Sequence, residues 1–193
     1  MMMTILEYAR KMLMKDNELL DLAKEEGFAA ALIDVDQIPI EPSFRAYCEE
    51  NLCGKYGANY SCPPDCGTVE ELREKLMREN RALIVQTVWS VESYDDIPAV
   101  EYAKKSHNNA VLRLADKMRK LGYEGFCSGY NGCPICDPCK LKDGLPCAHP
   151  EKQISCMSAY CIDVAKLAKR CGLEFAWTQG KLYLYGMVAF HEA

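Results

Sequence analysis

The sequence lacks the features that mark secreted, membrane-spanning and nucleic-acid-binding proteins. No apolar run approaches the roughly 18–20 residues needed to cross a bilayer, and the N-terminus has no basic stretch followed by an apolar one. We therefore expect a cytoplasmic protein with no membrane association. The net charge of −5 gives no basic surface for nucleic acid, so we expect no nucleic-acid partner.

Familiar catalytic motifs are also missing. The chain has no phosphate-binding P-loop, no nucleophile elbow, no HExxH zinc motif and no GxGxxG after a predicted strand. The sequence therefore assigns no catalytic residue and indicates no substrate or oligomeric state. If the protein is an enzyme, we expect it to use a redox centre or a cluster.

Apolar periodicity predicts alternating helices and strands. The composition, 49% apolar and 26% charged in 193 residues, suits a single domain over residues 1–193 with an ordinary core. The helices are predicted at 3–26 with a break near 16–17, from a Thr68 capping box onward, at 99–121 and at 159–171. The strands are predicted at 28–35, 82–89, 123–127, and 173–178 paired with 181–190 through a turn at 179–180. We infer an α/β fold, a mixed β-sheet flanked by helices, with cysteine-rich metal-binding loops at about 45–67 and 127–150.

Against these absences stands an excess of cysteine. Twelve cysteines occur in the chain, and a reducing cytoplasm disfavours stable disulfides. Clustered thiols are then better interpreted as metal ligands or redox groups. Isolated cysteines can instead pack as small apolar residues, which is our interpretation of Cys127 and Cys171. His107, on the apolar face of the 99–121 helix, is expected to be a core residue bound to a backbone carbonyl.

The strongest motif is a run of cysteines at three-residue intervals. Cys133, Cys136, Cys139 and Cys147 have the spacing x2, x2, x7. Prolines stiffen this segment and glycines allow the tight turns that would bring the sulfur atoms together. We predict that these four thiolates bind a metal centre. His149 follows closely, and it is a candidate to replace a thiolate or to donate a hydrogen bond to cluster sulfur.

Two kinds of metal centre fit this spacing. A [4Fe–4S] cluster takes four thiolates, and a CxxCxxC run is a familiar way to hold one. A zinc ion also takes four thiolates, and the spacing matches the structural zinc lobe of medium-chain alcohol dehydrogenases. Spacing alone does not choose the metal. We favour the [4Fe–4S] cluster, with Zn²⁺ as the alternative.

A second group of cysteines lies earlier in the chain. Cys48, Cys53, Cys62 and Cys66 have the spacing x4, x8, x3, which is less stereotyped. They are predicted to bind a second cluster or metal ion. The alternatives are that these thiols simply pack within a tight loop, or that some of them complete the first site.

The two groups together resemble the DUF2284 family of predicted metal-binding proteins. The resemblance runs from about residue 45 to the C-terminus and rests on Cys53-Gly-x-Tyr-Gly-x-Asn-Tyr-Ser-Cys62-Pro-Pro, CxxCxxC-x7-C, His149-Pro150 and Met157-Ser-Ala-Tyr-x-Ile162-Asp163-Val164. It implies metal binding without an established reaction. Such proteins are common in anaerobes, which favours oxygen-sensitive iron–sulfur chemistry.

The chain departs from the family pattern at two further cysteines. Cys156 and Cys161 stand where related sequences have serine and glycine, so they are reactive thiols, spare ligands or core residues, of which we favour core residues. Our functional prediction is a metal-binding protein that acts in electron transfer or redox support of a partner protein. The alternatives are a zinc-stabilised structural or interaction module, and an enzyme with a pocket between the two cysteine loops.

Overall fold

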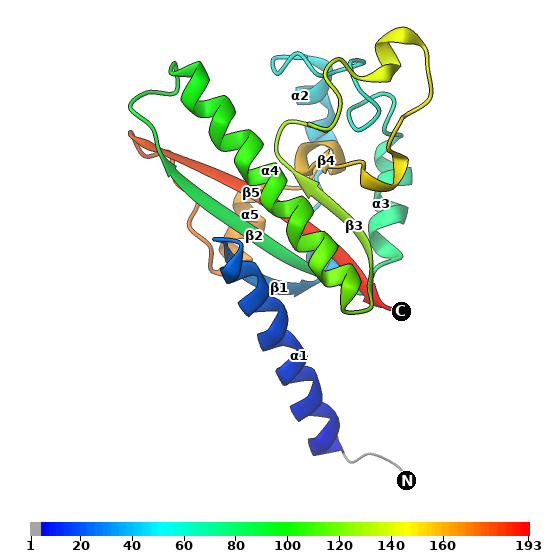
Figure 1. Ribbon diagram of the computed structural model, residues 1–193, viewed down its shortest axis with the longest axis vertical. Coiled ribbons are helices and arrows are strands. Elements are labelled where there is room, and N and C mark those ends of the chain that lie inside the picture. The colour runs from blue at the N-terminus through cyan, green and yellow to red at the C-terminus, as the bar shows by residue number, and fades with distance from the viewer. Residues whose placement is uncertain (1–4) are drawn as a thin grey trace.

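A mixed β-sheet forms the centre of the protein, with helices on both faces (Figure 1). The structure is a computed structural model that describes residues 5–193, with side chains from Met12 onward. Within this part of the chain the sheet has five strands in the order β1-β2-β5-β3-β4. The strands are β1 (Ala29–Asp34), β2 (Arg81–Ser90), β3 (Tyr123–Gly129), β4 (Ser155–Cys156) and β5 (Lys181–Glu192). The predicted α/β class with a mixed sheet is confirmed.

Most neighbouring strands are antiparallel, and β3 and β4 form a parallel pair. The longest strand, β5, lies between β2 and β3 and pairs with both. The α-helices are α1 (Ile5–Glu25), α2 (Arg45–Glu49), α3 (Val69–Met77), α4 (Ile97–Lys120) and α5 (Val164–Cys171). The ends of β3 and β4 lead directly into cysteine-bearing segments, so the sheet fixes where those segments start.

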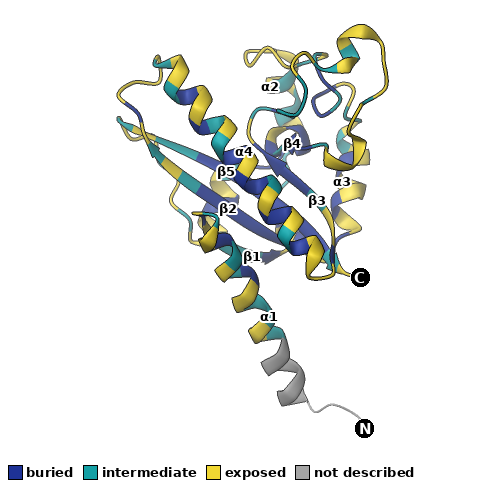
Figure 2. Cartoon of the chain, in the orientation of Figure 1, coloured by how far each residue is buried: buried dark blue, intermediate teal, exposed yellow. Residues whose placement is uncertain are grey.

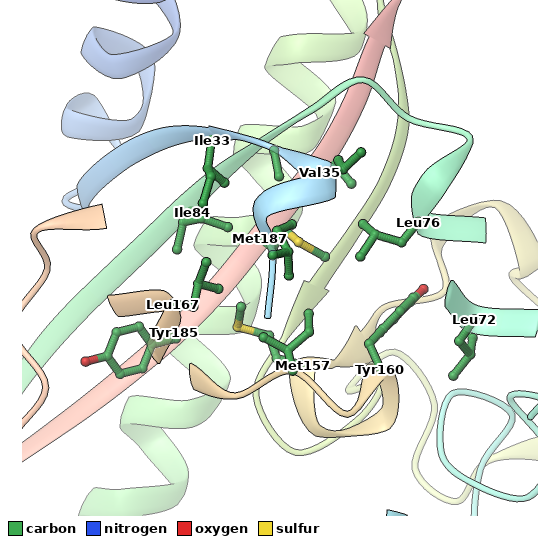
Figure 3. Close-up of a cluster of buried hydrophobic side chains, with 14 of the residues drawn as sticks. Ile33, Val35, Leu72, Leu76, Ile84, Met157, Tyr160, Leu167, Tyr185 and Met187 are labelled. Carbon is green, nitrogen blue, oxygen red and sulfur yellow. The ribbon is translucent and has the colours of Figure 1, made fainter. Parts of the chain in front are cut away.

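Each face of the sheet has its own apolar core. On one face, α1 and α4 pack against the strands through residues such as Leu19, Leu114 and Met118. On the other, Leu76 of α3 and Leu167 of α5 pack with Ile84 and Met187 of the sheet, as Figure 3 shows. Figure 2 shows the strands as the most buried elements, whereas the cysteine loops are largely half-buried or exposed.

Side-chain caps fix the starts of three helices. Thr68 and Glu71 form the predicted capping box at the start of α3, with Thr68 Oγ1 accepting from the Glu71 N–H at 3.1 Å. Asp96 caps α4 by accepting from the Ala99 N–H, and Asp163 caps α5 by accepting from the Lys166 N–H. The N–H of Lys166 holds the pKa of the Asp163 carboxyl below its ordinary value. Asp163 is therefore a helix cap.

Three sequence predictions are corrected by the structure. Helix α1 continues through residues 16–17 without a break. Helix α5 starts at Val164, because residues Met157–Tyr160 form a 3₁₀ turn and Cys161 adopts a left-handed conformation with φ of 54°. Residues 173–178 form no strand, and the Glu174 carbonyl in this segment accepts from the side chains of Gln86 and Tyr185. The predicted start of the first helix at residue 3 lies outside the described residues.

None of the helices in residues 5–193 is long and apolar enough to cross a bilayer.

His107 is buried in the core, as predicted. Its ring forms a hydrogen bond with the backbone of Tyr185, its Nδ1 atom also lies 2.8 Å from the Thr87 hydroxyl, and the side chain is completely buried. Burial disfavours the charged imidazolium and lowers the pKa to about 4. The folded protein therefore holds this residue neutral at pH values where the unfolded chain protonates it.

We expect His107 to weaken the fold as the pH falls. Because its folded pKa lies below the unfolded value, the unfolded state binds the proton first, and up to about 3 kcal/mol of stability is lost between neutral pH and about pH 4. Urea unfolding across this range checks this, since His107→Gln should fall less steeply than the parent. The control is His191→Gln. Glu79 raises the pKa of His191, so this residue stabilises the fold at low pH, and the stability of the variant should fall more steeply than that of the parent. Equal slopes for the parent and His107→Gln would contradict the assignment.

Candidate metal centre

The two cysteine loops, residues 45–67 and 127–150, lie side by side beyond the ends of β3 and β4 (Figure 1). The Tyr60 hydroxyl donates to the Leu145 carbonyl at 2.8 Å, and the Cys133 N–H donates to Ser61 Oγ at 3.0 Å. The Ser155 hydroxyl donates to the Ser61 carbonyl at 2.6 Å. These bonds attach the first loop both to the second loop and to strand β4.

Helix α4 positions the start of the second loop. Asn108 is buried in α4 and bonds the backbone of Tyr130 twice, with its amide donating to the carbonyl at 2.7 Å and its oxygen accepting from the N–H at 2.8 Å. Asn131 and Gly132 then adopt left-handed conformations, with φ of 59° and 81°. This turn directs Cys133 toward the first loop.

The four cysteines of the strongest motif line one small cavity. Its volume is about 20 Å³, and its walls include Tyr60, His149 and all four sulfur-bearing residues, Cys133, Cys136, Cys139 and Cys147. The structure therefore brings together the residues that the spacing predicted to meet. His149 lies at the same cavity, where the sequence placed it as a candidate ligand or hydrogen-bond donor.

Two backbone N–H groups point at the half-buried sulfur of Cys133. Burial raises the pKa of this thiol, but the N–H groups of Ile154 and Ile135 donate to its sulfur and oppose that effect. Backbone N–H groups aimed at sulfur stabilise the deprotonated form, which is the form that coordinates a metal. A bound cation would supply the remaining electrostatic stabilisation.

These sulfur atoms are not preassembled at bonding distance. In residues 5–193 no three His, Cys, Asp or Glu side chains are arranged so that they could hold a metal ion as they stand. Metal binding therefore requires the sulfur atoms to move inward. Four thiolates fit both tetrahedral zinc and a [4Fe–4S] cluster. A cavity of about 20 Å³ holds roughly one water-sized sphere, so a single ion needs less movement of the loop than a cluster.

The loop that carries these thiols can undergo such a movement. Between Cys133 and Cys147 the only regular element in the structure is the short 3₁₀ turn Lys140–Asp143. Because no strand or α-helix crosses the segment, its sulfur atoms can shift without breaking the sheet or a helix.

The second predicted set is divided between two places. Cys48, Cys53 and Cys62 line a cavity of about 380 Å³. Cys66 does not line it and borders a separate groove of about 210 Å³ beside Lys75. Its thiol points to the carbonyl of Gly67 at 3.9 Å. The metal-binding role of these four cysteines as one set stays a prediction.

Cys156, which the sequence favoured as a core residue, shares the cavity of the first three. The thiol of Cys62 donates a hydrogen bond to its sulfur, and the N–H groups of Ala159 and Ser158 do the same, which lowers the pKa of Cys156 to about 7. The bond to Cys156 raises the pKa of Cys62. No local pattern in the sequence signalled this arrangement, because the 3₁₀ turn that supplies these N–H groups is seen only in the structure.

Other cysteines are consistent with packing roles. Cys127 is buried in the core, and burial raises its pKa to about 12. Cys161 is completely buried, and burial also raises its pKa. Cys171, at the end of α5, is half-buried against the core around Leu167. These three thiols belong to neither cavity that holds the clustered cysteines.

The two cysteine loops approach each other closely at Gly132. A Cβ atom on Gly132 would lie 3.0 Å from the sulfur of Cys62 and 3.3 Å from the side-chain nitrogen of Asn59. Cys62 lines the large cavity, and its neighbour Ser61 lines the small one. Gly132 therefore allows the backbone of one loop to approach the sulfur of the other.

Comparison with known proteins identifies a family and nothing closer. The family sequence model described as "Predicted metal-binding protein (DUF2284)" matches residues 31–190. No curated protein and no solved structure matches the chain.

The contact at Gly132 predicts a specific sensitivity to substitution. We expect Gly132→Ala to lose about 1–3 kcal/mol of stability from its positive φ and, in addition, to displace the Cys62 sulfur. The control Gly27→Ala has a similar φ of 86° but nothing within 4 Å of the added atom, so it should show strain alone. Urea unfolding and the rate of thiol modification check this. Equal losses of stability with unchanged thiol reactivity would contradict the close contact.

Proposed function

The chain belongs to the DUF2284 family of predicted metal-binding proteins, and from that premise we propose that its principal centre is a [4Fe–4S] cluster held by Cys133, Cys136, Cys139 and Cys147. The observation that carries the proposal is the shared cavity of these four thiols. The N–H groups of Ile135 and Ile154 at the Cys133 sulfur support it further, because hydrogen bonds to ligand sulfur stabilise thiolate and tune a cluster.

We propose electron transfer, or redox support of a partner protein, as the role of this centre. A bound [4Fe–4S] cluster supplies one-electron redox chemistry. Among the described residues that line the small cavity, His149 and Tyr60 are the ionisable groups besides the cysteines, so the site carries little acid–base machinery. The ligand residues are half-buried, which leaves the centre near the surface where a partner protein can approach.

A zinc-stabilised structural or interaction module is the second candidate function. The volume of the cavity, about 20 Å³, favours it, because a single ion needs less expansion of the loop than a cluster does. In that case metal binding would contribute directly to the free energy of folding. A chelator would then unfold the cysteine loops.

We expect anaerobically purified protein to be brown, to contain iron and acid-labile sulfide, and to lose its visible absorption when dithionite reduces it. Cys136→Ser should remove most of the absorption of the principal centre, because a hydroxyl is a poor replacement for a thiolate ligand. Cys171→Ser is the matched control, since Cys171 lies in the core away from both cysteine cavities. Metal and sulfide analysis checks each protein.

Two outcomes would count against the cluster. A colourless protein with zinc bound in proportion to Cys136 would replace the cluster by the zinc-stabilised module. Equal iron content in the parent and Cys136→Ser would remove this loop as the ligand source.

A further inference from the structure

The large cavity of about 380 Å³ combines aromatic walls with a group of sulfur atoms. Tyr56, Tyr130 and Trp177 are among its aromatic side chains, and they come from three separate segments of the chain. Cys48, Cys53, Cys62 and Cys156 line the same space. The proposed principal centre uses none of these four residues.

Cys62 and Cys156 are in direct contact, although they are distant in the sequence. The Cys62 thiol donates to the Cys156 sulfur, and the Asn59 amide donates to the Cys62 sulfur at 3.4 Å. The N–H groups of Ser158 and Ala159 also point at Cys156. Both sulfur atoms are therefore held in place by polar hydrogens, as ligand thiolates are.

Cys48 and Cys53 lie around this pair. The Cys48 thiol donates to the Ser158 carbonyl at 3.8 Å, and the N–H of Ser158 points at the Cys156 sulfur. Cys48 interacts electrostatically with both Cys156 and Cys53. Cys53 is the exposed member of the group, so this group of cysteines is open to solvent on one side.

We propose that Cys48, Cys53, Cys62 and Cys156 form a second thiolate metal centre, in which Cys156 takes the place that spacing gave to Cys66. Four thiolates suit an iron–sulfur cluster or a zinc ion, and, as at the principal site, these sulfur atoms must move together to bind one. The site goes beyond the proposed function, because it shares no ligand with the principal centre and does not depend on it.

Cys66 is excluded from this set by its position. It borders a different groove, and its thiol donates to the neighbouring Gly67 carbonyl. The guanidinium of Arg45 also lies beside it and partly offsets the effect of burial on its pKa. Cys156, in contrast, lines the large cavity, and the Cys62 thiol and the N–H groups of Ser158 and Ala159 donate to its sulfur.

The cavity gives the second centre a different character from the first. A volume of about 380 Å³ lies within the range of small-molecule sites, whereas the principal site adjoins a space of only about 20 Å³. The second centre therefore borders a space that can admit a small apolar or aromatic molecule.

The test starts from a parent that lacks the principal site, Cys136→Ser/Cys139→Ser, purified without air. We expect it to retain metal, measured as iron, sulfide and zinc per chain. Adding Cys156→Ser or Cys156→Ala should remove most of that metal, whereas the matched control Cys66→Ser should leave it unchanged. Circular dichroism and urea unfolding must show that each variant is folded. If Cys156→Ser does not fold, Cys156→Ala is used for the metal measurement instead.

Cobalt(II) provides an independent probe of the same site. Added without air to metal-free parent protein, it should give strong thiolate-to-cobalt absorption, which Cys156→Ala reduces several-fold and Cys66→Ser does not change. Metal loss with Cys66→Ser but not with Cys156→Ser would overturn the proposal. A Cys62–Cys156 disulfide in the anaerobically isolated protein, or no metal and no cobalt absorption in the parent, would do the same.

The metal content of wild-type protein and of the Cys136→Ser/Cys139→Ser parent distinguishes failure of the second centre from failure of the principal one. If wild-type protein and the Cys136→Ser/Cys139→Ser parent hold equal amounts of metal, the principal site fails while the second stands. If wild-type protein holds metal and the folded parent holds none in either assay, the principal site stands while the second fails.

Discussion

The hydrogen bonds of Ser61 are the interaction on which both cysteine cavities depend. Its hydroxyl accepts from the Cys133 N–H and donates to Asn59 Oδ1 at 2.7 Å, while its carbonyl accepts from Ser155. Ser61 is almost completely buried, so these bonds are shielded from water and unmet polar groups there would be costly. Through this residue the first loop is attached to the second loop and to the sheet at once.

The fold supplies fixed positions around that junction. Helices on both faces of the sheet bury its strands and leave the ends of β3 and β4 free to carry loops. Asn108 of α4 holds the start of the second loop. The four thiols of the principal site sit on irregular backbone, so their positions can adjust to a metal while the sheet and helices around them stay fixed. This combination of a fixed frame and movable ligands is suited to a site that closes around a metal ion.

Local patterns in the sequence predicted much of this, and long-range contacts account for what they missed. The period of α4 and the capping box at Thr68 are local, and the structure places both as predicted. The Cys133–Cys147 spacing is also local, and its four cysteines line one cavity, while their metal binding stays a prediction. Residues 173–178 form no strand, and the Glu174 carbonyl accepts from the side chain of Gln86, a long-range contact that local periodicity cannot show. Cys156 meets Cys62 only because β4 lies beside the first loop, so its spacing from the other cysteines carried no signal.

Coordination of one inorganic centre by the sulfur atoms of Cys133, Cys136, Cys139 and Cys147 is the claim from which the functional proposals follow. X-ray absorption at the metal edge of anaerobically prepared protein tests it most directly, with the Cys136→Ser variant measured beside it. We expect a first shell made of sulfur, at about 2.3 Å if the metal is zinc and accompanied by iron neighbours if it is a cluster, and we expect that signal to weaken in the variant. A first shell of nitrogen and oxygen, or an unchanged signal in the variant, would contradict thiolate coordination by this loop.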